Sequence, residues 1–522
     1  MERTYQHTDQ QMHHRHPESE RGNCSTVIIG KDASVTGHFI VGHNEDDLDC
    51  VVQTHVVPRK KHPAGAVLRF DDGKAVIPQV EETYAYYWSE VRCKGGISFA
   101  DSFVNEWGLV IVTDSCRPSR DATGCPKDNR EDYGIGFALR RLVAERAKTA
   151  REAVSVIASL VEEFGYVSSR SYHLIDKDEA WIVQIPKGFR CVAKRLESDH
   201  VYYIPNWFTI HRIDFSDRNN YYWSKDLVTH AIEQGWYTPA VPGDWSDFDF
   251  AKAYQDGEMK EFNIIRARNA WRLLTGTQPD RDHLKPFSVK AQRKYSTEDV
   301  KNILRSHYEG SLDDASEGMT KNPHRGYDSP TTICNYSTVE STIFELNEDK
   351  NLIRMLRTAP RPCLAPYTPW YPVALTRVPA GYEWIGPDAS QAAHFAVDEE
   401  ELSFDPAKAF WMFKALQYLT EFDYKNTHRQ IHSSIQQLES RWEEEMPMVE
   451  AAYRAILGAA SGEDQRRCSD GNESVAETAA RNYLTQYTCS QAQLSWDWAK
   501  RMFTQLGEER MMANVRSHEG DD

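Results

Sequence analysis

The sequence predicts an α+β fold in which helices pack on antiparallel sheets. Four strand-like runs between residues 171 and 206 follow one another with only short turns between them. Parallel strands need longer crossovers, so these runs indicate antiparallel pairing. The middle of the chain has the order strands, helices, strands, in blocks that do not alternate one strand with one helix. This order favours helices packed on antiparallel sheets over the parallel sheet of an alternating βαβ chain.

The first predicted strand pair begins at residue 25, after a polar, histidine-rich stretch that we expect to be disordered. The runs TVIIG and HFIVGH form a hairpin, and Gly37 can adopt the positive φ that its turn needs. The run FVNEWGLVIVTDS predicts a second pair that turns at residues 106–108. The first hairpin places Cys24 at its head and the polar residues 43–47 at its tail.

The clearest predicted helix spans residues 150–164. Thr149 and Glu152 form a capping box at its start, and Gly165 suits the position after its end. Its apolar side chains recur at helical spacing: Val154, Ile157, Ala158 and Val161. Other segments predict a strand at 331–346 and helices at about 133–147, 295–310, 405–456 and 473–512.

Two segments are predicted to lie outside regular structure. Residues 311–330 carry Gly, Asp and Pro and predict an exposed loop. Residues 359–373 hold five prolines, which excludes a central strand or a helix and favours a surface loop over the wall of a substrate pocket. We expect four parts along the chain: a leader or propeptide at 1–23, a main domain at 24–400, a helical extension at 401–512 and a tail at 513–522.

Composition narrows the possible partners and compartments. The net charge of −17 argues against a nucleic acid partner and against an anionic membrane surface. Residues 1–23 lack the apolar stretch of a secretory signal, so we expect a cytoplasmic protein. The ten cysteines form no CxxC pair, and a chain this long does not need disulfides. His13, His14 and His16 could bind a metal ion, but a mobile polar leader is the favoured interpretation.

Cys24 is the residue whose position suggests chemistry. A thiol reacts as the thiolate, and the α-amine of an N-terminal cysteine can take the thiol proton near neutrality. This requires removal of the leader, which the same thiol could achieve by attacking the Asn23 carbonyl. Asp46 lies where the hairpin returns and could hold the freed amine. Spacing alone also fits a structural thiol beside a solvated turn.

The stretch CSTVIIGKDASVTGHFIVGHNEDD resembles the opening of the dipeptidase A family of N-terminal-nucleophile cysteine peptidases. Relatives of that family include secernins, bile-salt hydrolases and penicillin V acylases. Further stretches resemble later family motifs in the same order and extend the resemblance over roughly residues 24–420: VNEWGLVI, AERAKTAREAVSVIASLVEEFG, HLIDKDEAWIV, AKRL with YYIPNWFTI, and KYSTEDVKNILRSHYEG.

The resemblance implies a four-layer αββα fold with two stacked antiparallel sheets. It implies hydrolysis of a dipeptide or another small amide through a thioester, with no cofactor and no metal. Cys24 matches the nucleophile, Asp46 the carboxylate that positions the amine, and Asn206 the amide donor of the oxyanion hole. Asn206 could equally be a turn residue after Pro205.

Two further residues are assigned a supporting or substrate-binding role by the resemblance. His43 stands where relatives have an arginine, and it would carry less positive charge at neutral pH. Either Arg266 or Arg268 matches a supporting arginine of the acylases, and we assign Arg268 to this role.

Three functions remain open from the sequence. The leading one is a cysteine dipeptidase, which could be a homo-oligomer. A related enzyme could hydrolyse or form a different amide, because an amine can capture a thioester in place of water. A secernin-like protein could act through protein contacts, but the joint presence of Cys24, Asp46 and Asn206 favours an enzyme.

Overall fold

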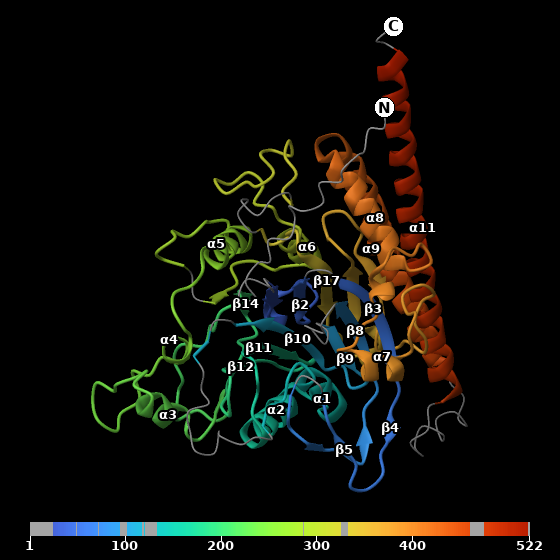
Figure 1. Ribbon diagram of the computed structural model, residues 1–522. Coiled ribbons are helices and arrows are strands. Elements are labelled where there is room, and N and C mark those ends of the chain that lie inside the picture. Colours follow the sequence, from blue (N-terminus) through green and yellow to red (C-terminus); the bar gives the residue numbers. More distant parts are fainter. Residues whose placement is uncertain are drawn as a thin grey trace, which may run out of the picture.

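Two stacked antiparallel sheets form the centre of the molecule (Figure 1). The computed structural model describes residues 24–47, 50–70, 73–93, 102–116, 119–120, 133–284, 287–324, 332–459 and 474–519. The predicted disordered leader lies outside these residues.

The first sheet has seven strands in the order β16-β14-β1-β2-β17-β18-β19. In chain order these are β1 (Ser25–Ile29), β2 (Ile40–Asp46), β14 (His200–Ile204), β16 (Ser288–Lys290), β17 (Thr338–Glu345), β18 (Arg354–Thr358) and β19 (Thr368–Trp370). The second sheet has eight strands in the order β15-β13-β12-β11-β10-β9-β8-β3. These are β3 (Cys50–Val57), β8 (Tyr86–Cys93), β9 (Ser102–Asn105), β10 (Val110–Ser115), β11 (Arg170–Ile175), β12 (Ala180–Ile185), β13 (Val192–Arg195) and β15 (Tyr221–Trp223).

Helices cover the outer face of each sheet. The helices α1 (Leu139–Arg146) and α2 (Ala150–Phe164) pack on the eight-stranded sheet. The helices α5 (Glu261–Thr275) and α6 (Thr297–Leu304) pack on the seven-stranded sheet, on the opposite side of the molecule (Figure 1). Because β1 contacts β10 and β17 contacts β3, the two sheets face each other directly. The predicted four-layer αββα fold is confirmed.

The side chains of β1 point alternately into two parts of the core, one between the two sheets and one between the first sheet and its helices. Ile28 belongs to the core between the two sheets, whereas Val27 and Ile29 pack with Trp271 and Leu304 of the helical layer. Successive side chains of a strand point to opposite faces, so both faces of β1 are buried. Cys24 has the same alternation as Thr26 and Ile28, which lie two and four residues after it. Its side chain therefore projects toward the space between the sheets.

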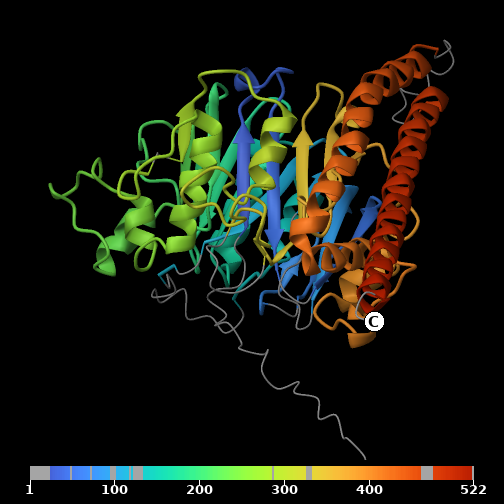
Figure 2. The ribbon, with the colours of Figure 1, turned by 90° about the horizontal axis from the view of Figure 1, so that it is seen from above.

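Helices from the last part of the chain cover one side of the sandwich (Figure 2). They are α7 (Pro387–Ala393), α8 (Ala409–Phe422), α9 (Tyr424–Gly458) and α11 (Val475–Glu519). Helix α11 contacts the edge strand β19 of the first sheet, and α7 and α8 contact the edge strand β3 of the second. None of the helices that the structure describes is both long and apolar enough to cross a membrane. The remaining elements are short: β4 (Lys60–Lys61), β5 (Val67–Leu68), β6 (Ile77–Pro78), β7 (Glu82–Thr83), α3 (Leu227–Glu233) and α4 (Phe250–Tyr254).

Most local predictions are confirmed. β1 pairs with β2, Gly37 has a φ of 75°, and Gly108 has a φ of 85° between β9 and β10. Helix α2 begins after Thr149, whose side chain accepts from the Glu152 amide, and it ends at Gly165. The predicted helix at 133–147 begins only at Leu139, the one at 295–310 ends at Leu304, and the last helix continues past 512 to Glu519.

Two predictions about the chain path are wrong. β14 does not continue the meander of β11, β12 and β13, but crosses to the other sheet and pairs with β1. This crossing brings the residues after β14 to the head of β1. Residues 359–373 are not an exposed loop, because nearly all of them are buried beneath the C-terminal helices, where Thr368–Trp370 forms the edge strand.

Candidate active site at Cys24

Cys24 lies directly before β1 and is 2% exposed. The register of β1 and β2 pairs Ser25 with Asn44, which places Glu45 across from Cys24. The Cys24 thiol donates toward Oε2 of Glu45 at 3.9 Å. The thiol therefore faces a carboxylate in the space between the sheets.

His43 completes the group around the thiol. Its Nε2 lies 3.7 Å from the same Glu45 oxygen, and the side chains of Cys24, His43 and Glu45 could reach one cation. Its Nδ1 lies 2.8 Å from Oγ1 of Thr26. Thr26 gives its only hydroxyl proton to Asp114, at 2.6 Å, so its oxygen accepts from Nδ1–H of His43. Neutral His43 consequently turns an unprotonated Nε2 toward the thiol and Glu45.

The other side of Cys24 is held by an arginine. Arg266 is fully buried in α5 and donates to the Cys24 carbonyl at 2.9 Å and to Oγ of Ser25 at 3.2 Å. Its second terminal nitrogen donates to Oδ1 of Asn206 and to Oδ1 of Asn263, each at 2.6 Å. One guanidinium therefore links the backbone of Cys24 to the Asn206 amide.

Asn206 follows β14, the strand that crosses between the sheets. Its Oδ1 is fixed by Arg266, and its Nδ2 donates to the Ser115 carbonyl at 3.0 Å. These contacts determine which side of the amide carries the donor, and Nδ2 has a second proton. The side chain is therefore held as a donor beside the head of β1.

Asp46 lies on the opposite face of β2 from Glu45. Its Oδ1 accepts from Thr338 and its Oδ2 from Asn335, both at 2.6 Å. Burial raises the pKa of Asp46 to about 7, against the effects of these two hydrogen bonds and of the positive charges of Arg266 and His43. The carboxylate is thus positioned by donors but lacks enough positive charge to offset its burial.

The register also relates Asp46 to the backbone of Cys24. Ser25 pairs with Asn44, so continuing this register by one residue sets Cys24 against Glu45 and turns its backbone nitrogen toward the Asp46 end of β2. Glu45 lies beside the sulfur of Cys24, and Asp46 is the next carboxylate along β2, on the side toward which the Cys24 nitrogen is turned.

The structure corrects one expectation about this site and excludes one alternative. Arg266, and not Arg268, reaches Cys24, because Arg268 projects from another side of α5 and contacts the Pro279 carbonyl and Asp313. Residues 43–47 are buried, so they do not form a solvated turn.

The sequence predicted that Cys24, His43, Asp46 and Asn206 lie in one region, and it offered Arg266 as the alternative to Arg268. It gave no role to Glu45, Asn335 or Thr338. Strand alternation could have identified Glu45, because it shares a face with His43. Nothing local marks Asn335 or Thr338, which reach Asp46 from almost 300 positions away.

The chain belongs to peptidase family C69, whose model matches residues 23–437. It is similar to a probable dipeptidase B of Streptococcus pyogenes serotype M3, with 26% identity over 343 residues, covering 62% of this chain and 66% of that protein. A probable dipeptidase of Latilactobacillus sakei is 26% identical over 298 residues, covering 55% of this chain and 61% of that protein. The matched part thus spans just under two thirds of these relatives. The resemblance inferred from the sequence is confirmed.

Among solved structures, penicillin V acylase from Agrobacterium tumefaciens is 14% identical and has a TM-score of 0.31, with 64% of this chain and 82% of that chain covered. A mutant of the conjugated bile acid hydrolase from Clostridium perfringens is 10% identical and has a TM-score of 0.25, with 65% and 89% covered.

Proposed function

We propose that the protein is a cysteine dipeptidase whose nucleophile is the thiol of Cys24 in a chain that begins at this residue. Membership of peptidase family C69 and the names of the similar proteins support this proposal. The observation that carries it is the position of Asp46, a buried carboxylate that two donors hold one residue beyond Glu45, which faces the Cys24 thiol.

Removal of the leader would complete the site around Asp46. A free α-amine at Cys24 is cationic for part of the time near neutral pH. Its positive charge would lower the pKa of Asp46, which burial otherwise raises to about 7. Asp46 would in turn orient the amine as the base that takes the proton of the thiol.

Hydrolysis would then proceed in two steps. The Cys24 thiolate attacks the carbonyl carbon of the scissile amide, the α-ammonium returns its proton to the leaving amine, and a thioester remains. Water, deprotonated by the same α-amine, attacks the thioester and releases the carboxylate product and the thiol. Nδ2 of Asn206 would donate its second proton to the oxyanion in each step, with Arg266 fixing the amide.

Cleavage before Cys24 needs a different base, because the nitrogen of Cys24 is then part of an amide. We propose that Glu45, whose Oε2 lies 3.9 Å from the sulfur, accepts the thiol proton with His43 beside it. The thiolate attacks the Asn23 carbonyl, the bond between residues 23 and 24 breaks, and the freed nitrogen takes the proton. Water then hydrolyses the thioester and releases the leader.

We propose a small-molecule substrate and a cytoplasmic setting. The net charge of −17 supports a partner other than nucleic acid. The eight cysteines that the structure describes form no disulfide, which fits a reducing compartment.

The proposal is tested with a panel of dipeptides and N-acyl amino acids, read by mass spectrometry. We expect dipeptides to be cleaved and Asn206→Ala to lower kcat by about 10²–10³-fold, the usual effect of losing one oxyanion donor. Cleavage of N-acyl amino acids alone would instead favour an acylase. Turnover that survives alkylation of Cys24 would exclude this nucleophile.

A further inference from the structure

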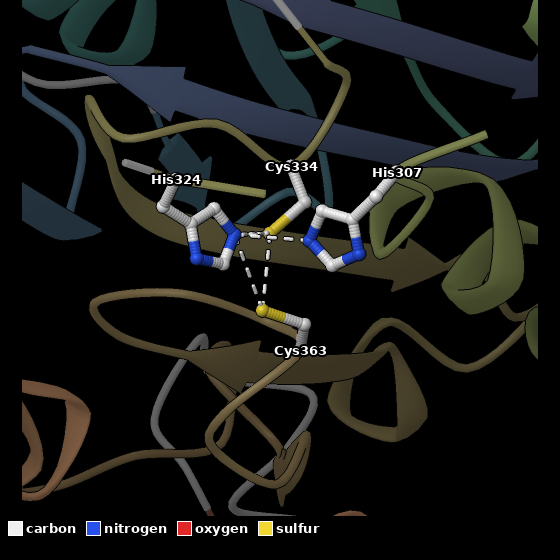
Figure 3. Close-up of side chains that lie close together, drawn as sticks. All are labelled: His307, His324, Cys334 and Cys363. Atoms are coloured by element: carbon white, nitrogen blue, oxygen red, sulfur yellow. Dashed lines mark hydrogen bonds between the residues drawn. The ribbon is translucent and has the colours of Figure 1, made fainter. Parts of the chain in front are cut away.

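A second group of cysteine and histidine side chains, which shares no residue with the group at Cys24, lies close together (Figure 3). His307 follows α6, His324 lies in the loop beyond it, Cys334 precedes β17, and Cys363 lies between β18 and β19. All four are buried, with exposures between 0% and 8%. Four separate segments thus bring two sulfurs and two imidazoles to one point.

The spacing of the four potential ligand atoms is close to that of a tetrahedron around one ion. The two Nε2 atoms lie 2.9 Å apart and the two Sγ atoms 3.4 Å apart. Nε2 of His324 lies 3.7 Å from Sγ of Cys334 and 3.6 Å from Sγ of Cys363. Zinc bonds of about 2.3 Å to sulfur and about 2.0–2.1 Å to nitrogen correspond to tetrahedral edges of about 3.3–3.8 Å. Only a small expansion is needed to admit the ion.

A carboxylate lies close to the opposite nitrogen of each imidazole. Nδ1 of His307 lies 2.8 Å from Glu309, and Nδ1 of His324 lies 3.1 Å from Glu421. The hydrogen bond to Glu309 fixes the proton of His307 on Nδ1 and leaves the lone pair of its Nε2 directed inward, and the nearby charge of Glu421 favours the same tautomer in His324. This arrangement is the usual outer shell of histidines that ligate zinc.

We propose that His307, His324, Cys334 and Cys363 bind one zinc ion in a closed structural site. Two thiolates and two imidazoles select zinc over hard cations such as Mg²⁺ and Ca²⁺. The two thiolates balance the charge of the ion, which makes the buried centre neutral. Four protein ligands leave no position for a reactive water, so the ion would hold segments together and take no part in hydrolysis.

A disulfide between Cys334 and Cys363 explains less of this arrangement. It would require the sulfurs to approach from 3.4 Å to about 2.05 Å. It would also give no role to the two inward Nε2 atoms or to the carboxylates behind them.

The zinc site would also support the candidate active site. Cys334 is adjacent to Asn335, which donates to Asp46 at 2.6 Å. Arg361, two residues before Cys363, donates to the Asn335 carbonyl at 3.0 Å. An ion that joins Cys334 to Cys363 would therefore fix the segment that positions Asp46.

The test is the metal content of the full chain, purified without chelators from zinc-supplemented cells and measured by plasma mass spectrometry. We expect about one zinc per chain. Cys334→Ser and Cys363→Ser should each retain less than about a tenth of it. Cys191→Ser is the matched control, since Cys191 is a buried free thiol outside the cluster.

Two further variants separate this site from other potential ligands. A triple His13→Ala, His14→Ala, His16→Ala chain and a Cys24→Ser chain should keep their zinc. Loss of zinc from either would place the metal on the leader or beside Cys24 and overturn the proposal.

Cobalt replacement keeps the test decisive if a serine variant fails to fold. Wild-type protein loaded with Co²⁺ should show the thiolate charge-transfer absorption and the intense visible bands of tetrahedral cobalt. Absence of both zinc and these bands from the folded wild-type chain would overturn the proposal. An intact mass that is two hydrogens below the expected value, and that returns to it on reduction, would show a disulfide. This result would also overturn the proposal.

Discussion

The two buried cysteine and histidine clusters contain similar side chains but differ in where the carboxylates lie. At Cys24, Glu45 stands 3.9 Å from the single sulfur. At Cys334 and Cys363, the carboxylates lie behind the imidazoles, and the sulfurs face the Nε2 atoms. A carboxylate that faces a thiol can accept its proton, whereas a carboxylate behind a histidine directs a lone pair toward a metal. The position of the acid thus distinguishes a proton-transfer site from a ligand site.

The two clusters are connected through one short segment. Residues 332–338 carry Cys334 at one end and the Asp46 contacts Asn335 and Thr338 further along. A substitution at the ligand cluster should therefore shift the side chain of Asp46, but it should lower kcat less than a substitution of Asp46 itself.

The largest of these effects is expected from Asp46→Asn. Neutralising Asp46 removes the partner of the α-amine, and we expect kcat to fall by about 10²–10³-fold, within the usual range for a misplaced general base. The matched control is Asp47→Asn, because Asp47 is also buried but lies with Cys50 and Cys93. Equal losses in the two variants would show that the carboxylate is misassigned.

Stability measurements separate this effect from misfolding. In a Cys24→Ala chain that stays uncleaved, the pKa of Asp46 is raised by burial from 3.8 to about 7. A raised carboxyl pKa means that the folded state binds the proton more tightly, so stability falls as pH rises between these values. Adding Asp46→Asn should therefore shift Tm increasingly in favour of the Asn variant from about pH 4 to about pH 7. A Tm difference independent of pH would show that Asp46 has an ordinary pKa.

Removal of the proposed zinc ion should have an intermediate effect. We expect a chelator to lower Tm by several degrees and kcat by about tenfold to hundredfold, because Asn335 would no longer be held firmly against Asp46. Melting curves and steady-state kinetics before and after zinc is restored measure both changes. Full activity in a demonstrably zinc-free chain would show that the two clusters are independent.

Glu45→Gln should slow leader release by at least about tenfold, because a neutral amide cannot accept the thiol proton. A fusion whose tag protease leaves Cys24 as the first residue bypasses this step, and there the loss of kcat should be smaller. Time courses of leader release and of turnover compare the two. A larger loss in turnover than in release would move Glu45 from processing to hydrolysis.

The smallest effect is expected from His43→Arg. A permanent charge beside the thiol favours the thiolate, so the rising limb of kcat/KM should move to lower pH. His43→Gln provides an uncharged comparison of smaller size. Arg is large for a residue that is 1% exposed, so melting curves must accompany the pH profiles. An unmoved limb in a normally folded Arg variant would remove His43 from thiol activation.

Local sequence patterns predicted most of the elements, because caps, turns and alternation act over a few residues. Thr149 and Gly165 bound α2 as expected, and Gly37 adopts the positive φ of its turn. The crossing of β14 to the other sheet was not predictable in this way, since it depends on which strand edge is available in three dimensions.

The same limit applies to the candidate site. Cys24 and Asp46 lie in one hairpin and could be paired from their spacing. Arg266 and Arg268 were both candidates, and Arg268 was the wrong choice. Residues two positions apart lie on nearly opposite sides of α5, and the sequence did not show which side faces β1. The cluster of His307 and Cys363 spans 56 positions, and no short ligand motif marks it.

The most direct test of the central claim is the N-terminus of the active protein. N-terminal sequencing and intact mass should show that active wild-type chains begin at Cys24, whereas Cys24→Ala chains keep residues 1–23 and have no activity. Kinetics on the same preparations link the two observations. Fully active enzyme that retains its leader would contradict the account, because the nitrogen of Cys24 would then be an amide and could not act as the base.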